Sequence, residues 1–173
     1  MKLTAAIVMS YPNAQVRHID REYDVCAIYK GNDTIDVIHD KNGIRSYGAL
    51  RIYQCQLILT PLSKISDEDA VEVAKMAISK SEIKGFKVVQ IRREDYAVKV
   101  IIEFDGKDGL GMYWVNITSY GMPQFLKRVG STLHELHYQF LQCCIDYLRS
   151  NGYDLGHGSI PSLIAAGVAM EKK

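Results

Sequence analysis

The sequence predicts an α+β fold: an antiparallel β-meander with additional short N-terminal strands, one middle helix and a long C-terminal amphipathic helix packed on the sheet. Three observations predict it. Apolar residues alternate with polar ones over residues 96–104 and 112–118, as in strands with one buried face. A capping serine and three acidic residues open a helix over residues 67–79. Apolar residues repeat at helical spacing over residues 131–151.

The N-terminal part predicts one short helix and several short strands. Residues 3–9 form the helix, which ends before Pro12 because proline disfavours helix in the preceding residue. Strands are expected over residues 13–19, 25–30 and 34–39. Gly-Asn-Asp at residues 31–33 is a hairpin signal, and residues 40–43 predict another turn.

The middle of the chain holds one ambiguous segment and one well-defined helix. Residues 50–59 suit either a strand or a buried helix, and Pro61 closes the segment. Ser66 is a good N-cap, and the carboxylates of the first turn favour the helix dipole, so we expect a helix from Asp67 to about Ser79.

A three-stranded meander follows. The expected strands are residues 86–92, 96–104 and 112–118. The glycine-rich residues 105–111 join two strands and do not open a helix, so we interpret them as a hairpin connection and not as a phosphate loop.

The C-terminal helix is expected to be the main core element. It begins at Ser131, and Asn151 followed by Gly152 is a standard stop signal. We expect the residues after it to be ordered, including the short piece at residues 159–167. No linker or repeat interrupts the chain, so we predict a single domain, residues 1–173.

Composition indicates an ordinary globular protein. The chain of 173 residues carries a formal net charge of +1, so no global field favours nucleic acid. The cysteines at positions 26, 55, 143 and 144 form neither a Cys-x-x-Cys pair nor a secreted framework. Free thiols in a reducing cytoplasm are the simplest interpretation. No apolar stretch approaches 18 residues, so no membrane-spanning helix is expected.

Histidines supply the candidates for catalysis. His134 and His137 are three residues apart, whereas the zinc protease motif needs histidines four apart. His137 also lies on the apolar face of the expected helix, which favours a core role. His157, between two glycines, is the more exposed candidate for a general base, although alone it is more often a loop residue.

Basic residues around the first two strands of the meander are the candidates for nucleic-acid contact. Phe86 and Tyr96 lie among them, and a basic sheet face with aromatic residues can bind single strands. A solvated sheet surface is the alternative, because strand alternation places some of these residues on opposite faces. The set comprises Lys84, Lys87, Arg92, Arg93 and Lys99.

Three stretches together resemble a family of uncharacterised small proteins encoded by phages and prophages of gut bacteria. They are residues 56–63, which precede the acidic helix start, residues 146–155, and residues 160–164 with Gly167. Together these stretches comprise 24 of the 173 residues. The resemblance implies a phage or prophage origin and a cytoplasmic product, and it carries over no functional residue.

The sequence contains no cofactor motif, no metal site and no recognisable nucleophile motif. We therefore expect a non-enzymatic phage or prophage accessory protein that binds a host or phage macromolecule, most plausibly a protein. The alternatives are nucleic-acid binding through the basic sheet face and a small enzyme with a His-based site. A deep pocket joining His157, Cys143 or Asp154 would argue against the expected function.

Overall fold

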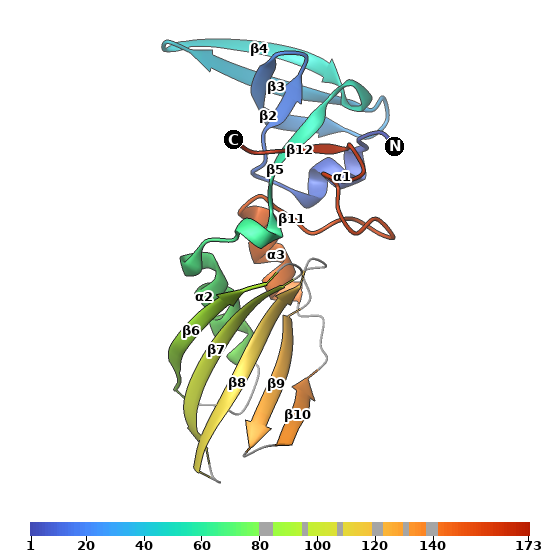
Figure 1. Ribbon diagram of the computed structural model, residues 1–173. Helices are drawn as coiled ribbons and strands as arrows, with labels where there is room; N and C mark the ends of the chain where they lie inside the picture. Colours follow the sequence, from blue (N-terminus) through green and yellow to red (C-terminus); the bar gives the residue numbers. More distant parts are fainter. Residues whose placement is uncertain (80–84, 95–96, 107–108, 119–122, 130–131, 138–141) are drawn as a thin grey trace. The chain divides into compact units, whose positions relative to one another are not determined.

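The computed structural model describes residues 1–79, 85–94, 97–106, 109–118, 123–129, 132–137 and 142–173 of the chain. The chain divides into two compact units, drawn with their elements in Figure 1. Unit 1 comprises residues 1–61 and 149–173, and unit 2 comprises residues 62–148. The described elements make a mixed α+β protein whose sheets are mostly antiparallel. The expectation of a single domain over residues 1–173 stays a prediction.

Unit 1 is built on a seven-stranded sheet with the order β11-β5-β1-β2-β3-β4, in which β12 also pairs with β5. The C-terminal strands β11 and β12 are parallel to β5, and Figure 1 shows β12 in red beside the green β5. The elements are α1 (Ala5–Ser10), β1 (Val16–His18), β2 (Arg21–Tyr29), β3 (Thr34–Lys41), β4 (Ile44–Arg51), η1 (Ile52–Gln54), β5 (Gln56–Pro61), β11 (Tyr153–Asp154) and β12 (Ala169–Glu171).

The core of unit 1 lies between α1, the sheet and the C-terminal residues. Thr4 caps α1 by accepting a hydrogen bond from the Ile7 N–H, and the short helix before Pro12 is confirmed. Its Ile7 and Val8 are buried, as is Leu57 at the centre of β5. Leu163 and Val168 from the C-terminal part join this core, so the residues after Gly152 are ordered as expected.

A buried carboxylate holds the C-terminal segment in place. Asp154 is 5% exposed, and its Oδ1 accepts hydrogen bonds from the N–H groups of Gly156 and Leu163. Its Oδ2 accepts from the Ser162 hydroxyl and the Ile164 N–H. Four donors compensate the cost of burying the charge, and they fix a turn that the chain must make before β12.

The hairpins β2–β3 and β3–β4 form the outer part of the unit 1 sheet. Tyr29 pairs with Thr34 across the expected Gly-Asn-Asp turn, which is confirmed. Asn42 and Gly43 have φ angles of 54° and 80°, the left-handed values of a type I′ turn, and they join β3 to β4. The ambiguous residues 50–59 divide into the end of β4, the η1 turn and strand β5.

Unit 2 is a five-stranded antiparallel sheet with the order β10-β9-β8-β7-β6, and α2 packs on β7, β8 and β9 (Figure 1). The three expected strands of the meander are confirmed as β6, β7 and β8. The elements are η2 (Leu62–Lys64), α2 (Asp67–Ile78), β6 (Lys87–Arg93), β7 (Ala97–Gly106), β8 (Gly109–Thr118), β9 (Pro123–Val129), β10 (Thr132–His137) and most of α3 (Gln142–Ser150).

The middle helix begins where the sequence predicts it. The Ser66 hydroxyl accepts a hydrogen bond from the Asp69 N–H, which satisfies one of the free donors at the helix start. Val73, Ala74 and Ala77 of α2 are buried, because they recur at helical spacing on the side that faces the sheet. Tyr147 of α3 donates a hydrogen bond to the Asp69 carboxylate, which links the two helices of unit 2.

The long helix over residues 131–151 is not confirmed. Helix α3 covers only Gln142–Ser150, whereas Thr132–His137 is strand β10, antiparallel to β9. The physical reason is visible in the sequence, since Gly-Ser lies between the paired residues Val129 and Thr132 and is typical of a two-residue hairpin connection. The expected stop is confirmed, because Gly152 has a φ of 76° and donates its N–H to the Arg149 carbonyl.

Candidate functional site

Strand β4 stands at one end of the unit 1 strand order and has a free edge among the residues that the structure describes. Its residues pair with β3 without a register shift, from Ile44 opposite Lys41 to Arg51 opposite Thr34. In a two-residue hairpin the residues that flank the turn form a hydrogen-bonded pair, and such pairs alternate along the ladder. The backbone N–H and C=O groups of alternate residues in β4 therefore point away from β3. These are Arg45, Tyr47, Ala49 and Arg51, of which the Arg51 carbonyl accepts a hydrogen bond from the Cys55 thiol.

This edge is exposed on both faces of the sheet. All residues from Ile44 to Ala49 are exposed, and Ile44 and Tyr47 show 71% and 73% of their surface to solvent. Leu50, by contrast, is partly buried against the core of unit 1. A strand at the edge of an antiparallel sheet usually buries one face. The exposed half of β4 buries neither face, so its pairing with β3 is the main interaction that holds it.

The side chains of the four outward residues share one face of β4, because successive side chains alternate. Two of them are arginines, and Arg45 lies 3.6 Å from the carboxylate of Asp40 in an exposed ion pair. On the neighbouring strands, the Tyr29 hydroxyl donates to the Asp36 carboxylate at 2.9 Å. The free edge of β4 thus combines hydrogen-bonding groups of the main chain, a tyrosine and positive charge.

Of the five basic residues predicted for nucleic-acid contact, four lie in the described part of unit 2 and Lys84 lies outside it. Arg93 donates to the Asp67 carboxylate at 2.6 Å and to the carbonyl of Ser63. Lys99 lies 3.2 Å from the Glu94 carboxylate. These two cations therefore face carboxylates.

The other two basic residues lie on β6 at separate positions of the ladder. Lys87 is opposite Glu103 on β7, whereas Arg92 is opposite Lys99. The structure brings Arg92 and Lys99 together, but it separates Lys87 from them and directs Arg93 to Asp67. A nucleic-acid function for this set stays a prediction.

The three candidate histidines are divided between the units. His134 and His137 belong to strand β10 of unit 2, and their side chains lie outside the described residues. His157 belongs to unit 1, where its backbone forms a bridge with Ile160. Its Nδ1 is buried and has no hydrogen-bond partner among the described residues. The described residues therefore place no hydrogen-bonded catalytic partner at this nitrogen.

All four cysteines are free, and each unit holds one exposed and one buried thiol. Burial raises the pKa of Cys55 to about 11. Burial and then the neighbouring Cys143 raise the pKa of Cys144 to about 12. The buried thiols are therefore poor nucleophiles. In the described residues, no three His, Cys, Asp or Glu side chains gather as metal ligands.

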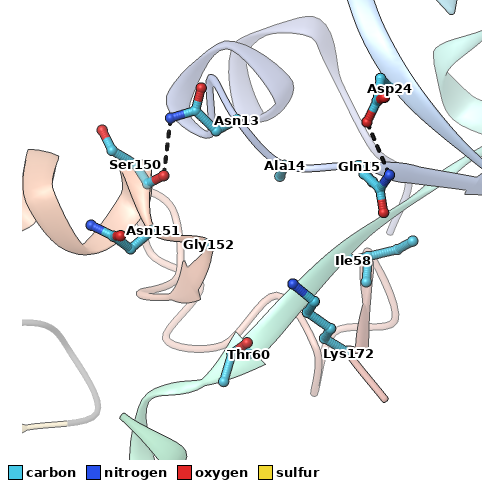
Figure 2. Close-up of a pocket in the computed structure, with 10 residues that line it drawn as sticks. All are labelled: Asn13, Ala14, Gln15, Asp24, Ile58, Thr60, Ser150, Asn151, Gly152 and Lys172. Carbon is cyan, nitrogen blue, oxygen red and sulfur yellow. Dashed lines mark hydrogen bonds between the residues drawn. The ribbon is translucent and has the colours of Figure 1, made fainter. Parts of the chain in front are cut away.

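Unit 1 contains two cavities of about 400 Å³ each. One is apolar and lies between α1 and β2, with Val8, Val25 and Ile28 among its lining residues. The other is polar and is lined by residues of five segments of unit 1 (Figure 2). Neither cavity is lined by His157, Cys143 or Asp154.

Neither the free edge of β4 nor the polar cavity was predicted from the sequence. One signal for β4 was present, because Asn42-Gly43 after a predicted strand is the strongest short-range hairpin signal and implies a second strand. No signal pointed to Lys172, the cation of the polar cavity, since it is distant in sequence from the other lining residues.

Comparisons with protein-family models, with curated proteins and with solved structures give no match for this chain. Among the described residues, no helix has the length and apolar character needed to cross a membrane.

Proposed function

We propose that this protein acts by binding another protein. An extended segment of that partner pairs as an added strand with the free edge of β4. The observation that carries the proposal is the regular pairing of β4 on one side and its exposure on both faces. Strand addition uses main-chain hydrogen bonds for affinity and alternate side chains for specificity. Natural proteins protect exposed edges by covering, shortening, bending or charging them, and β4, which is eight residues long and has no bulge, carries only the charges of its two arginines.

The charges of β4 select the kind of partner. Two copies of β4 can pair in an antiparallel register in which their four outward residues lie opposite one another. In that register, Arg45 of each copy faces Arg51 of the other. Like charges directly opposite each other destabilise a strand pair. The edge therefore disfavours self-pairing and favours a segment with carboxylates opposite the two arginines and an apolar or aromatic residue opposite Tyr47.

The test replaces Tyr47 in two ways. Tyr47→Pro removes an outward N–H and places a proline ring at the free edge, while the ladder with β3 loses no hydrogen bond. Tyr47→Thr removes the same aromatic ring and keeps the N–H. The tagged protein and both variants are used to capture partners from a lysate of a gut-bacterial host, with and without nuclease, and circular dichroism checks that all three are folded.

We expect a protein partner that survives nuclease, is retained by Tyr47→Thr and is weakened by about 10-fold or more in Tyr47→Pro. The amides of Arg45, Tyr47 and Ala49 should also gain protection from hydrogen exchange in the complex. Equal retention by both variants would contradict strand addition at β4. Partners that are lost on nuclease treatment would instead favour the basic face of unit 2.

The biological setting is part of the proposal and rests on the resemblance to phage and prophage proteins. On that basis, the protein is a non-enzymatic accessory protein in the cytoplasm of a bacterial host, and its partner is a host or phage protein. An enzyme with a His-based site remains the other alternative, and His157 is the histidine whose surroundings are described.

A further inference from the structure

The polar cavity of unit 1 is formed by segments that are distant in sequence. It is lined by the loop before β1, by β2, by β5, by the end of α3 and by the residue after β12. Figure 2 shows these residues around the cavity, with the Lys172 amine pointing into it. The lining residues are Asn13, Ala14, Gln15, Asp24, Ile58, Thr60, Ser150, Asn151, Gly152 and Lys172.

Two amide side chains of the lining are held by hydrogen bonds that their nitrogens donate. The Asn13 Nδ2 donates to the Ser150 carbonyl at 3.1 Å, and the Gln15 Nε2 donates to the Asp24 carboxylate at 2.9 Å. A carbonyl and a carboxylate can only accept, so these contacts fix which end of each amide is nitrogen. The Gln15 oxygen is therefore left as an acceptor, whereas the Asn13 oxygen points away from the other lining residues (Figure 2).

Opposite charges lie at the same cavity without neutralising each other. Asp24 and Lys172 both line it, and neither has an ion-pair partner among the described residues. Both residues are exposed, and Asp24 also accepts the hydrogen bond from Gln15. The Lys172 backbone is held in place, because its N–H donates to the Leu59 carbonyl at 2.8 Å. The end of α3 adds the partial negative charge of a helix C-terminus to the lining.

We propose that this cavity binds a small zwitterion of the amino-acid class, with its carboxylate at Lys172 and its ammonium group at Asp24 and the Gln15 side-chain oxygen. A ligand with only one charge could pair with either the lysine or the aspartate but not with both, whereas a zwitterion matches the two charges of the lining. Ile58 and Ala14 are the apolar side chains of the lining, so a polar or small side chain is the better fit. The proposal is independent of strand addition at β4.

The test uses the whole chain and defined probes. Each of the twenty common L-amino acids is titrated by calorimetry, and the tightest binder is compared with its N-acetyl derivative, its carboxamide and acetate. We expect a dissociation constant below about 1 mM for at least one amino acid. Each derivative lacks one charge and should bind about 10-fold or more weakly, as expected for loss of a charged hydrogen bond.

Two variants assign the charges to the two ends of the ligand. Lys172→Met should weaken binding of the amino acid by about 10-fold or more and leave binding of the carboxamide unchanged. Asp24→Asn should weaken binding of the amino acid by a similar factor and leave binding of the N-acetyl derivative unchanged. Lys173→Met and Asp20→Asn are the matched controls, because neither residue lines the cavity. The proposal is overturned if no amino acid binds with a dissociation constant below about 10 mM, or if acetate binds as tightly as the best amino acid. It is also overturned if the control variants lose as much affinity as Lys172→Met and Asp24→Asn.

Discussion

The two units of this protein are built in opposite ways. In unit 2 each strand from β6 to β10 pairs with its neighbour in the sequence, and every pair is antiparallel. In unit 1, strand β5 pairs with β1 in an antiparallel arrangement and with β11 and β12, from the other end of the chain, in parallel. Unit 2 thus depends on local contacts, whereas the core of unit 1 depends on residues 149–173.

Buried thiols let the two units be compared in one experiment. At pH 8, iodoacetamide should label Cys26 and Cys143 at least about 100-fold faster than Cys55 and Cys144. The pKa values of about 11 for Cys55 and about 12 for Cys144 lie above the usual thiol pKa. At pH 8 these two thiols therefore form little thiolate and should react more slowly. Mass spectrometry of timed samples measures the four rates.

Full unfolding in guanidinium provides the control, because all four cysteines should then react at similar rates. The residual labelling of Cys55 reports the opening of unit 1, and that of Cys144 reports the opening of unit 2. A buried thiol that reacts as fast as an exposed one in the native protein would contradict the packing described for its unit.

The next largest effect is expected in unit 1, at Gly156. This residue has a φ of 75°, and an added Cβ would clash with the carbonyl oxygen of Ile160 and lie 2.7 Å from the Pro161 carbonyl. Gly156→Ala should lower the free energy of unfolding by roughly 3 kcal/mol or more and accelerate labelling of Cys55. Gly158 also has a positive φ but open space around it, so Gly158→Ala should cost about 1 kcal/mol.

Urea denaturation of the two glycine variants measures this difference. If the units open separately, Gly156→Ala should leave the labelling rate of Cys144 unchanged. Equal costs for the two substitutions would show that the close approach of residues 156 and 160 does not constrain unit 1.

A smaller effect is expected at the start of α2 in unit 2. Ser66→Ala removes the cap of the helix and should cost about 1 kcal/mol, with faster labelling of Cys144 and no change at Cys55. Ser63→Ala is the matched control, since Ser63 is exposed and should change the stability by less than about 0.5 kcal/mol. If the Ser66 variant is as stable as the Ser63 variant, the cap does not stabilise unit 2.

The difference between the units also explains which elements the sequence could predict. Helix α2 and strands β6, β7 and β8 carry local signals, namely a cap, helical spacing and strict alternation. Strand β4 was missed because exposure on both faces removes alternation, and Arg45, Ser46 and Gly48 are not typical of strands. The parallel strands β11 and β12 carry no local signal, because only β5, distant in sequence, gives them a partner.

The candidate sites were less predictable than the fold. Isolated histidines and basic residues were the only chemical signals in the sequence, and the structure pairs Arg93 and Lys99 with carboxylates. The free edge of β4 is a property of the backbone, and the polar cavity is formed by residues 13–24 and 150–172 with β5. Neither can be found from residue types until the strand order is known.

The parallel pairing of β12 with β5 has a consequence for how the protein is made. A ribosome synthesises residues 1–61 before residues 153–171, so β5 lacks two of its three partner strands until the latter have left the exit tunnel. The whole of unit 2 is synthesised during this delay and can form its local hairpins. The sheet of unit 1 therefore stays incomplete until β11 and β12 have been synthesised.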